Sequence, residues 1–556
     1  MYPLGFLPFF CSLVSHDAAV HAALLVPLVV LALWFYAVAL RPQLAAKNAD
    51  DVRPVQLPGS SLSHILPFFH RRFDFINQGF ELAGQAIYQF SLLRNPVIVL
   101  SGEAARRDFF QAKDLDLGAG FKFLSGAIPM LPGVTTELGP RVTALIYKRL
   151  AASQTSESLS RHSRRTMSAW GYSGTLDPFE SVSELLFQIS VRALAFTELA
   201  DDPAIVKRLR ELYDALDTAT TPATVLLPWI PSPSAVRKIL STKRIYDIIS
   251  KALDDRVKNG VARDDTPQML IDAGDERLII IGRWVFCCSV PADEYHFRPA
   301  ASWLFTFLSG HPEWREKAAE EMRGLIARHV APSSPLCTSV SRAESPTDNA
   351  PGHHPERASS SSSSAREGSP HNLPPMSSLT ASLSNIPLSA WENETPVLDA
   401  LIRETLRVAE PHVAMRQYLP LSQSHAADKE LFLGGRQIPR GAYVMYPFSD
   451  VHLSSEIYKD PWRWDPARKE MDLKAPYSYV GMGAGSTMCQ GKRLATLELK
   501  LITAQVVLGF RELRAVDTRG ATLSELPRPN WNDVLTCKPP KGSCYVRYER
   551  TGEHDP

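Results

Sequence analysis

Cysteine is scarce in this chain, and its placement follows no structural pattern. The 556 residues include seven cysteines, which are too few and too scattered for a disulfide framework. No pair has the spacing of zinc ligands, because Cys287 and Cys288 are adjacent and Cys537 lacks a C-x-x-C partner. The pattern excludes a disulfide-rich secreted scaffold and fits a globular part that faces a reducing cytosol.

An excess of charge of either sign is also absent. Sixty Lys and Arg residues stand against 59 Asp and Glu residues, which leaves a net charge of +1. A nucleic-acid-binding protein would show a strong basic excess, so this class is excluded. The apolar content of 45% in 556 residues is enough for one large core or two smaller ones.

The N-terminal region lacks basic residues. No Lys or Arg precedes Arg41, which argues against a cleavable signal peptide, while residues 22–40 form an uncharged apolar run. This run is about long enough to cross a bilayer as a helix, and the first basic residues follow it. The sequence therefore predicts a lumenal segment at 1–21, a transmembrane anchor at 22–40, a Pro-rich hinge at 41–59 and a cytosolic domain at 60–550.

Helical periodicity dominates the chain after residue 60. Strand-like stretches are short, so the expected fold class is mainly α with small β-sheets. The expected helices cover 181–197, 204–216, 234–261, 303–330 with a break at 310–312, and 397–408, and the expected strands cover 96–100, 431–433, 442–446 and 543–548. Residues 332–388 are rich in Ser and Pro and predict a disordered insert, which is regulatory, inert or a wrongly predicted exon.

Cys489 is the residue with the clearest chemical meaning. It follows a glycine-rich turn and precedes a helical pattern, where backbone N–H groups and the helix dipole stabilise a thiolate. Such a thiolate is suited to bind haem iron as an axial ligand, although a buried, inert cysteine in a loop is the alternative.

Three further features precede Cys489 in order. Glu404 and Arg407 are spaced i, i+3 and share one helix face, Arg416 lies in a short predicted strand, and Arg468 lies in a Pro-rich loop.

Together these motifs make the chain resemble the cytochrome P-450 superfamily of haem-thiolate monooxygenases. The resemblance implies that Glu404 and Arg407 pair with Arg468, and that Gly485, Cys489 and Gly491 belong to the haem-binding loop. Three positions depart from the family pattern: Met482 replaces an aromatic residue, Ala467 a glutamate, and Thr487 the arginine that usually holds a haem propionate. Arg416 matches a strand arginine that often contacts a propionate, and it is expected to carry more of that role here.

The oxygen-activating helix departs further from the family. Its acid and alcohol positions hold Tyr295 and His296, and the segment 299–303 resembles the branch of prostacyclin synthase and the sterol 7α-hydroxylases. Three interpretations follow for Tyr295 and His296. His296 relays protons itself, the relay is dispensable because the enzyme rearranges a peroxide, or both side chains simply pack against neighbouring helices.

The resemblance also implies cofactors, partners and a location. We expect haem b ligated by Cys489 and electrons from NADPH through a membrane-bound diflavin reductase at the endoplasmic reticulum, with Lys492 and Arg493 helping to dock it. The expected substrate is lipophilic, such as a sterol, terpenoid or secondary metabolite. Two other hypotheses stay open at this point: a reductase-independent peroxide isomerase or dehydratase, and a haem-binding protein with little catalysis.

Overall fold

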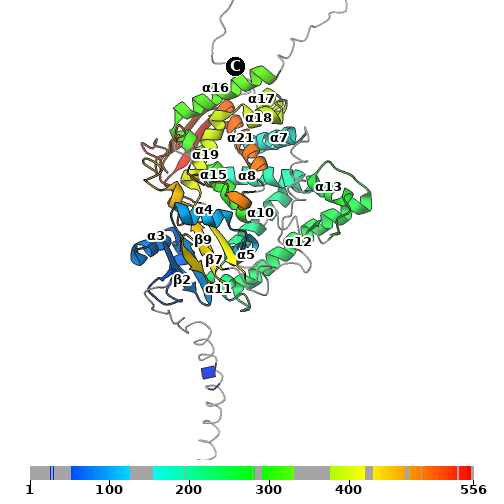
Figure 1. Ribbon diagram of the computed structural model, residues 1–556. Coiled ribbons are helices and arrows are strands. Elements are labelled where there is room, and N and C mark those ends of the chain that lie inside the picture. The colour runs from blue at the N-terminus through cyan, green and yellow to red at the C-terminus, as the bar shows by residue number, and fades with distance from the viewer. Residues whose placement is uncertain are drawn as a thin grey trace, which may run out of the picture.

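The protein is described by a computed structural model, in which helices make up most of the molecule and the sheet strands gather at one side (Figure 1). It describes residues 26, 29–30, 52–125, 154–194, 196–277, 280–281, 291–330, 376–419, 430–469, 475–489, 491–534 and 537–551. The side chains of residues 154–157, 194, 291–298 and 376–378 lie outside this description.

The N-terminal part alternates short helices and strands. Its elements are β1 (Val55–Gln56), α2 (Ile65–His70), α3 (Arg72–Ala83), β2 (Ile87–Leu92), β3 (Asn95–Leu100), α4 (Glu103–Gln111), β4 (Leu115–Asp116) and α5 (Leu117–Ser125).

The middle of the chain is almost entirely helical. It contains α7 (Gln154–Ala169), β5 (Ser173–Leu176), α8 (Pro178–Leu194), α9 (Thr197–Asp201), α10 (Pro203–Thr218), α11 (Pro222–Leu226), α12 (Pro233–Asn259), α13 (Thr266–Asp272), α15 (Pro291–Gly310) and α16 (Pro312–His329). The two long amphipathic helices α10 and α12 begin with the expected signals. Asp202 and Ser232 accept hydrogen bonds from the first free backbone N–H groups, and a proline follows each of them.

The C-terminal part returns to mixed structure. It contains α17 (Met376–Ser384), α18 (Leu388–Asn393), α19 (Pro396–Ala409), β6 (Val413–Tyr418), β7 (Leu431–Leu433), β8 (Arg436–Ile438), β9 (Tyr443–Pro447), α20 (Ser449–His452), the 3₁₀ turn η4 (Gly485–Thr487), α21 (Lys492–Gly509), β10 (Phe510–Val516) and β11 (Tyr545–Arg550).

The strands assemble into peripheral sheets. The largest has the order β1-β2-β3-β9-β6-β4, a second has the order β10-β11-β5, and β7 pairs with β8. In the largest sheet β6 and β9 are antiparallel, with Arg416 opposite Val444. This sheet lies at the bottom of Figure 1, whereas α16, α17 and α18 lie at the top.

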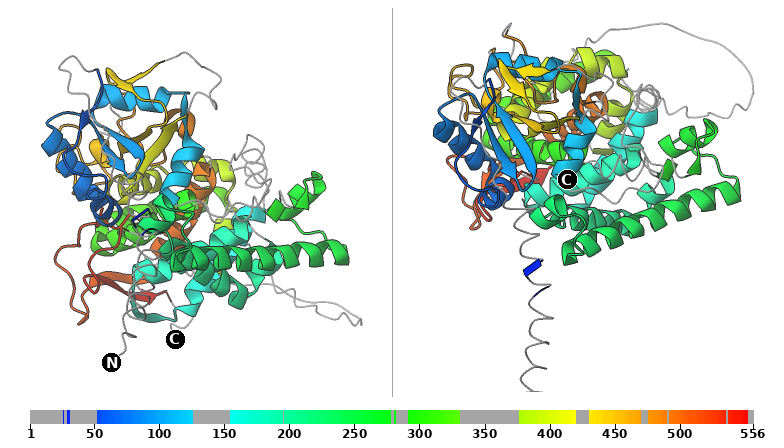
Figure 2. Two further views of the ribbon diagram at one scale, coloured as in Figure 1. Left: turned by 90° about the horizontal axis from the view of Figure 1, so that it is seen from below. Right: turned by 60° about the horizontal axis from the view of Figure 1, so that its bottom comes forward.

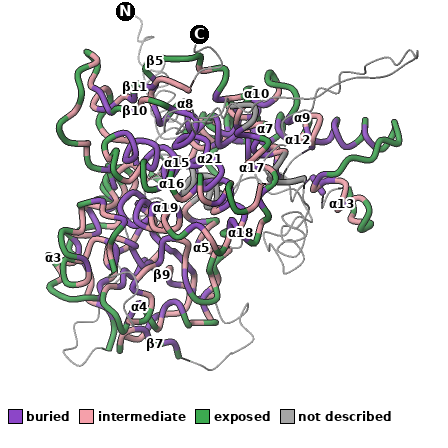
Figure 3. Tube along the Cα trace, turned by 90° about the horizontal axis from the view of Figure 1, so that it is seen from above, coloured by how far each residue is buried: buried purple, intermediate pink, exposed green. Residues whose placement is uncertain are grey.

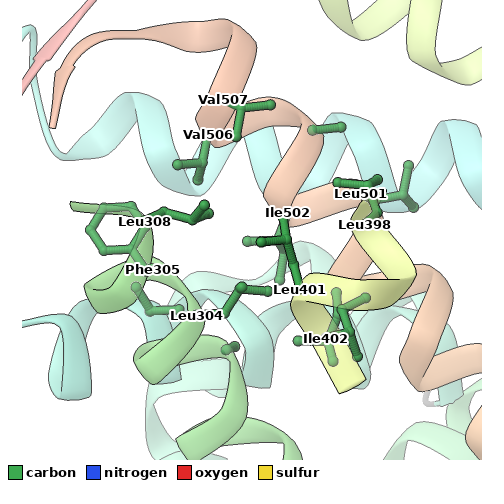
Figure 4. Packing of buried hydrophobic residues seen from close by; sticks show 14 of the residues in the cluster. Leu304, Phe305, Leu308, Leu398, Leu401, Ile402, Leu501, Ile502, Val506 and Val507 are labelled. Atoms are coloured by element: carbon green, nitrogen blue, oxygen red, sulfur yellow. The ribbon is translucent and has the colours of Figure 1, made fainter. Parts of the chain in front are cut away.

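The main core lies between these two regions. Leucine, isoleucine, valine and phenylalanine side chains of α15, α19 and α21 interdigitate there (Figure 4). The tube coloured by burial shows the same centre in purple, with α12 and α13 on the outside (Figure 3). The long α12 runs along one edge of the molecule (Figure 2). The mainly helical fold class with small sheets is therefore confirmed.

Two of the predicted segments contain regular structure, because tertiary contacts order short stretches within them. Val55 and Gln56 of the predicted hinge pair with β2 as β1, and Leu57 beside them is buried. Helix α17 lies inside the predicted disordered insert, and its Leu379 and Leu383 are buried in the main core. Residues 331–375 of that insert lie outside the described residues.

The predicted membrane anchor lies almost wholly outside the described residues. Within residues 22–40, only Val26, Val29 and Val30 are described, and they are helical and exposed. Over the part of the chain that the structure describes, we find no helix with the length and apolar character needed to span a bilayer. The anchor stays a prediction.

Candidate functional site

The structure brings Glu404, Arg407 and Arg468 together in a buried cluster. Arg407 donates two hydrogen bonds of 2.8 Å to the Glu404 carboxylate, one to each oxygen. Arg468 donates from Nε to Glu404 Oε1 at 3.0 Å, and the backbone N–H of Asp465 donates to the same oxygen at 2.9 Å. All three charged side chains are almost fully buried, so this carboxylate between two guanidiniums is a satisfied ionic cluster.

This cluster ties α19 to the loop 459–468 through backbone carbonyls. Arg407 donates to the carbonyls of Pro461 at 2.7 Å and Arg463 at 3.2 Å, and Arg468 donates to those of Asp460 and Arg463, both at 2.8 Å. Ala467, at the usual glutamate position of the family pattern, contributes no charge to this arrangement. The loop is fixed without it, because the two arginines use their guanidinium donors on its backbone.

His452 links the same cluster to the cysteine loop, and sequence reasoning missed it. Its backbone carbonyl accepts a 2.6 Å hydrogen bond from Arg407 Nη1, and its ring Nε2 accepts a 3.1 Å hydrogen bond from the Val480 N–H. The ring is fully buried and stacks on Tyr479. Burial, together with the charges of Arg407 and Arg106, holds the pKa of His452 well below its usual range, so the ring is neutral and Nε2 keeps its lone pair.

The cysteine loop begins at Val480 and requires glycine at two of its turns. Gly483 and Gly485 both have positive φ, and a Cβ on Gly485 would lie 2.3 Å from the Phe110 carbonyl oxygen. Gly485 opens the turn η4, and Gly491 precedes the first residue of α21. Cys489 donates its N–H to the Met482 carbonyl at 2.9 Å, which closes the loop back on itself.

Cys489 is half-buried and borders an open groove of about 350 Å³. The groove is lined by residues of the loop, α18, α19 and α21: Trp391, Glu392, Asp399, Met488, Cys489, Lys492, Arg493, Thr496, Leu497 and Lys500. Arg493 pairs with Glu392, and Lys500 pairs with Asp399 at 2.7 Å. Lys492 is exposed at the start of α21.

Arg416 lies in β6 on the other side of the loop and is almost fully buried. Its Nη1 donates to the Phe109 carbonyl at 2.6 Å, its Nη2 donates to the Thr487 hydroxyl, and its Nε has no acceptor among the described residues. Burial lowers the pKa of Arg416 to about 10, against an ordinary value of 12.5. A buried guanidinium with an unused donor is suited to bind an anion, and a haem propionate is an anion of this kind.

Tyr295 and His296 are placed only by their backbone. Both belong to α15, a helix that continues through Pro299 to Gly310. Their side chains lie outside the described residues, so the proton relay and the packing interpretation both stay predictions.

A buried arginine–carboxylate cluster linked to a glycine-rich cysteine loop, with an arginine beside the loop whose Nε lacks an acceptor among the described residues, is the arrangement that the haem-thiolate resemblance implies. Three comparisons with known proteins agree with this class. The profile of the family described as Cytochrome P450 matches residues 390–527, which include Glu404, Arg407, Arg416, Arg468 and Cys489.

Similar sequences and a similar solved structure support the same class. The chain is 25% identical to the cytochrome P450 monooxygenase dmxR5 of a Cryptosporiopsis species, with 80% of each chain covered. It is 21% identical to the sterol 14-demethylase of Arabidopsis thaliana, with 84% of each covered. A retinoic-acid-bound cyanobacterial CYP120A1 has the same fold, with a TM-score of 0.61 at 17% identity, covering 90% of this chain and 99% of the other.

Residues 390–527 match the cytochrome P450 family, and the relatives and the fold support assignment of this chain to that superfamily, whose similar members are named monooxygenases and are therefore oxidoreductases. The family implies a haem held through a thiolate and electrons supplied by a redox partner. The resemblance of α15 to the prostacyclin synthase branch stays a prediction.

Proposed function

We propose that the protein binds haem b through the Cys489 thiolate and hydroxylates a lipophilic substrate, such as a sterol, a terpenoid or another secondary metabolite. The observation that supports this most directly is the chain of contacts from Glu404 and Arg407 through His452 to the Cys489 loop. Bound haem would supply the oxygen-activating chemistry, while the residues of this chain hold its ligand and its propionate in place.

Cys489 is the best candidate ligand among the three cysteines that the structure describes. Burial raises the pKa of the Cys537 thiol well above its usual range and that of the Cys544 thiol to about 12, so both stay protonated at neutral pH. Cys489 instead borders an open groove and is half-buried, so its thiol is accessible. The close approach of Gly485 to the Phe110 carbonyl also restricts the conformation of the loop that carries Cys489.

The substrate class and the electron source rest on similarity. Curated relatives include a sterol 14-demethylase of Arabidopsis thaliana and a lanosterol 14-alpha demethylase of Bos taurus, the latter 23% identical over 79% of this chain. We infer that this chain also takes an apolar polycyclic or terpenoid substrate and receives electrons from NADPH through a diflavin reductase at the endoplasmic reticulum membrane. The groove beside Cys489, with the exposed Lys492 at its rim, is the proposed docking face.

The spectrum of the reduced, carbon-monoxide-bound protein tests the ligand. We expect the red-shifted Soret band of thiolate ligation in the unmodified protein and its loss in Cys489→Ser, because a neutral hydroxyl is a poor electron donor to iron. Cys544→Ser is the matched control, since Cys544 is a buried cysteine directly before β11 and should keep the band. Retention of the red-shifted band in Cys489→Ser would contradict the assignment.

A further inference from the structure

The Thr487 hydroxyl connects the cysteine loop to Arg416. It stands where the family pattern has an arginine, two residues before Cys489. Its hydroxyl accepts a hydrogen bond from Arg416 Nη2 and donates one of 3.1 Å to the Ala484 carbonyl. A single hydroxyl thus connects the loop to a buried arginine that comes from β6, 71 positions away along the chain.

The other contacts of Arg416 fix the plane of its guanidinium. The group lies 4.2 Å from the centre of the Phe109 ring and 5.5 Å from that of Phe110, and Nη1 donates to the Phe109 carbonyl. Arg416 is 1% exposed, so its rotamer has little freedom. Nη1 therefore donates to the Phe109 carbonyl and Nη2 to the Thr487 hydroxyl. The Nε–H group has no acceptor among the described residues.

The backbone around Arg416 and Thr487 is closely packed. The Phe110 carbonyl, which follows the carbonyl that Arg416 uses, lies against Gly485 so closely that no side chain fits there. The end of α4, the strand β6 and the turn η4 consequently meet around Arg416 and Thr487. A displacement of Thr487 would therefore change the hydrogen bond that orients the Arg416 guanidinium.

No carboxylate of the described residues forms an ion pair with Arg416, whose bonds run only to neutral oxygens. Burial without an anionic partner disfavours the charged guanidinium, which accounts for its lowered pKa. An anion bound here would remove much of that cost. A hydroxyl is a suitable partner for such an arginine, because it orients the guanidinium and leaves its positive charge available. A carboxylate in the same place would neutralise that charge.

We propose that Thr487 is a positioning residue that aims Arg416 at a haem propionate, so that one oriented arginine does the work of the arginine that the loop lacks. This proposal rests on the proposed haem site and adds a role for Thr487 to it. It concerns how firmly the haem is held, whereas the identity of the iron ligand is tested separately by the Cys489→Ser spectrum.

The test measures the release of haem from the holoenzyme to excess apomyoglobin. Thr487→Val keeps the shape of the side chain and removes the hydroxyl, so we expect release to become about tenfold faster, as for the loss of one hydrogen bond to a charged group. Thr487→Ser retains the hydroxyl and should release haem at close to the original rate. Thr503→Val is the control for losing a buried threonine hydroxyl, since Thr503 bonds only the Leu499 carbonyl of its own helix in the described structure.

A second arm separates positioning from simple support of the loop. The same variants are reconstituted with haem whose two propionates are methyl esters, which removes the anion that Arg416 would bind. We expect Thr487→Val and the unmodified protein to release this haem at the same rate. An equal acceleration with both haems would show that Thr487 only braces the loop, and no acceleration with native haem would overturn the proposal. In either case an intact red-shifted carbon-monoxide band in the unmodified protein leaves the Cys489 assignment standing.

Discussion

At the scale of single residues, the site depends on side chains that hold other side chains in place. Among the described residues, Glu404 forms no hydrogen bond with the cysteine loop, yet it fixes Arg407, whose guanidinium donates to the His452 carbonyl. His452 then receives the Val480 N–H at the start of the cysteine loop. The position of Cys489 is therefore set by a relay of hydrogen bonds that begins in α19.

His452 is the residue in this relay that a mutation can test most cleanly. Replacing it by leucine leaves the buried Val480 N–H without its acceptor, which costs about 1–3 kcal/mol. We expect His452→Leu to lose part of the red-shifted carbon-monoxide band, because the loop is no longer held in one conformation. His452→Gln, whose amide oxygen can accept from Val480, should restore most of the band.

The pH dependence separates this role from a charge effect. Since the pKa of His452 lies well below its usual range, the ring stays neutral at pH 6–8 and the fraction of red-shifted band in the unmodified protein should not change there. A band that changes with pH over this interval, or an unchanged band in His452→Leu, would exclude His452 from the relay.

Sequence reasoning found part of this site for local reasons. The i, i+3 spacing of Glu404 and Arg407 is a property of one helix, so it is visible in the sequence. Arg468 was recognised only through the family pattern, because its contact with Glu404 spans 64 positions. His452 gave no signal, since a histidine after a short apolar segment looks the same whether it packs in a core or accepts a backbone hydrogen bond.

At the scale of elements, the helices α10 and α12 are joined by a buried lysine. Lys238 of α12 is 3% exposed and donates from Nζ to the Thr220 hydroxyl beyond the end of α10, at 3.2 Å. Burial lowers the pKa of Lys238 from 10.5 to about 8, with Asp217 opposing this shift. The charged form is therefore less favourable in the folded protein than in the unfolded chain.

This shift predicts how stability changes with pH. Between pH 8 and 10.5 the unfolded chain binds the lysine proton and the folded protein releases it, so the free energy of unfolding rises with pH across this interval. Below pH 8 the folded protein bears the full cost of burying the charge, about 3 kcal/mol for such a shift. Lys238→Met should therefore be more stable at pH 7 by about 1–3 kcal/mol, after allowance for the lost hydrogen bond to Thr220.

Denaturant unfolding at pH 7 and pH 9.5 measures both effects. The stability difference between Lys238→Met and the unmodified protein should shrink at the higher pH. Lys243→Met is the matched control, because Lys243 of the same helix is exposed and should change stability by the same small amount at both pH values. A Lys238→Met protein that is less stable at pH 7 would show that the lysine is stabilised in its charged form.

The elements themselves were predictable where their signals were local. Asp202-Pro203 and Ser232-Pro233 start α10 and α12 as the capping rules expect, and Pro312 separates α15 from α16. Strand β1 was missed, because two residues carry no periodicity and their partners Tyr88 and Gln89 lie beyond two helices. Helix α17 was missed because its serine-rich composition resembles that of the segment before it, and only burial of Leu379 and Leu383 distinguishes it.

At the scale of the whole molecule, the proposed electron source predicts which partners turnover requires. Turnover of a lipophilic substrate should require NADPH and a diflavin reductase, and Lys492→Glu should raise the reductase concentration needed for half-maximal rate several-fold. Lys492 lies at the groove rim beside Cys489, where a negative charge would repel an acidic partner. Lys243→Glu, an exposed charge on α12, should leave this concentration unchanged.

The opposite result points to a different function. Conversion of a lipid peroxide without NADPH would favour the peroxide isomerase or dehydratase suggested by Tyr295 and His296, and would contradict the monooxygenase proposal for this chain. Stable haem with neither reaction across a broad lipophilic panel would favour a haem-binding protein with little catalysis. The carbon-monoxide spectrum is the same in the first two cases, so turnover has to be measured directly.

The sequence alone indicated Glu404, Arg407 and the Cys489 turn as candidates for the chemistry, and the helices beside them, because helix periodicity, caps and a glycine-rich turn are properties of short stretches of chain. It could not determine what those residues contact. The bonds from Arg407 to His452, from Val480 to His452 and from Arg416 to Thr487 join segments that lie tens of positions apart, and they form only when the core of α15, α19 and α21 and the sheet of β6 and β9 bring those segments together.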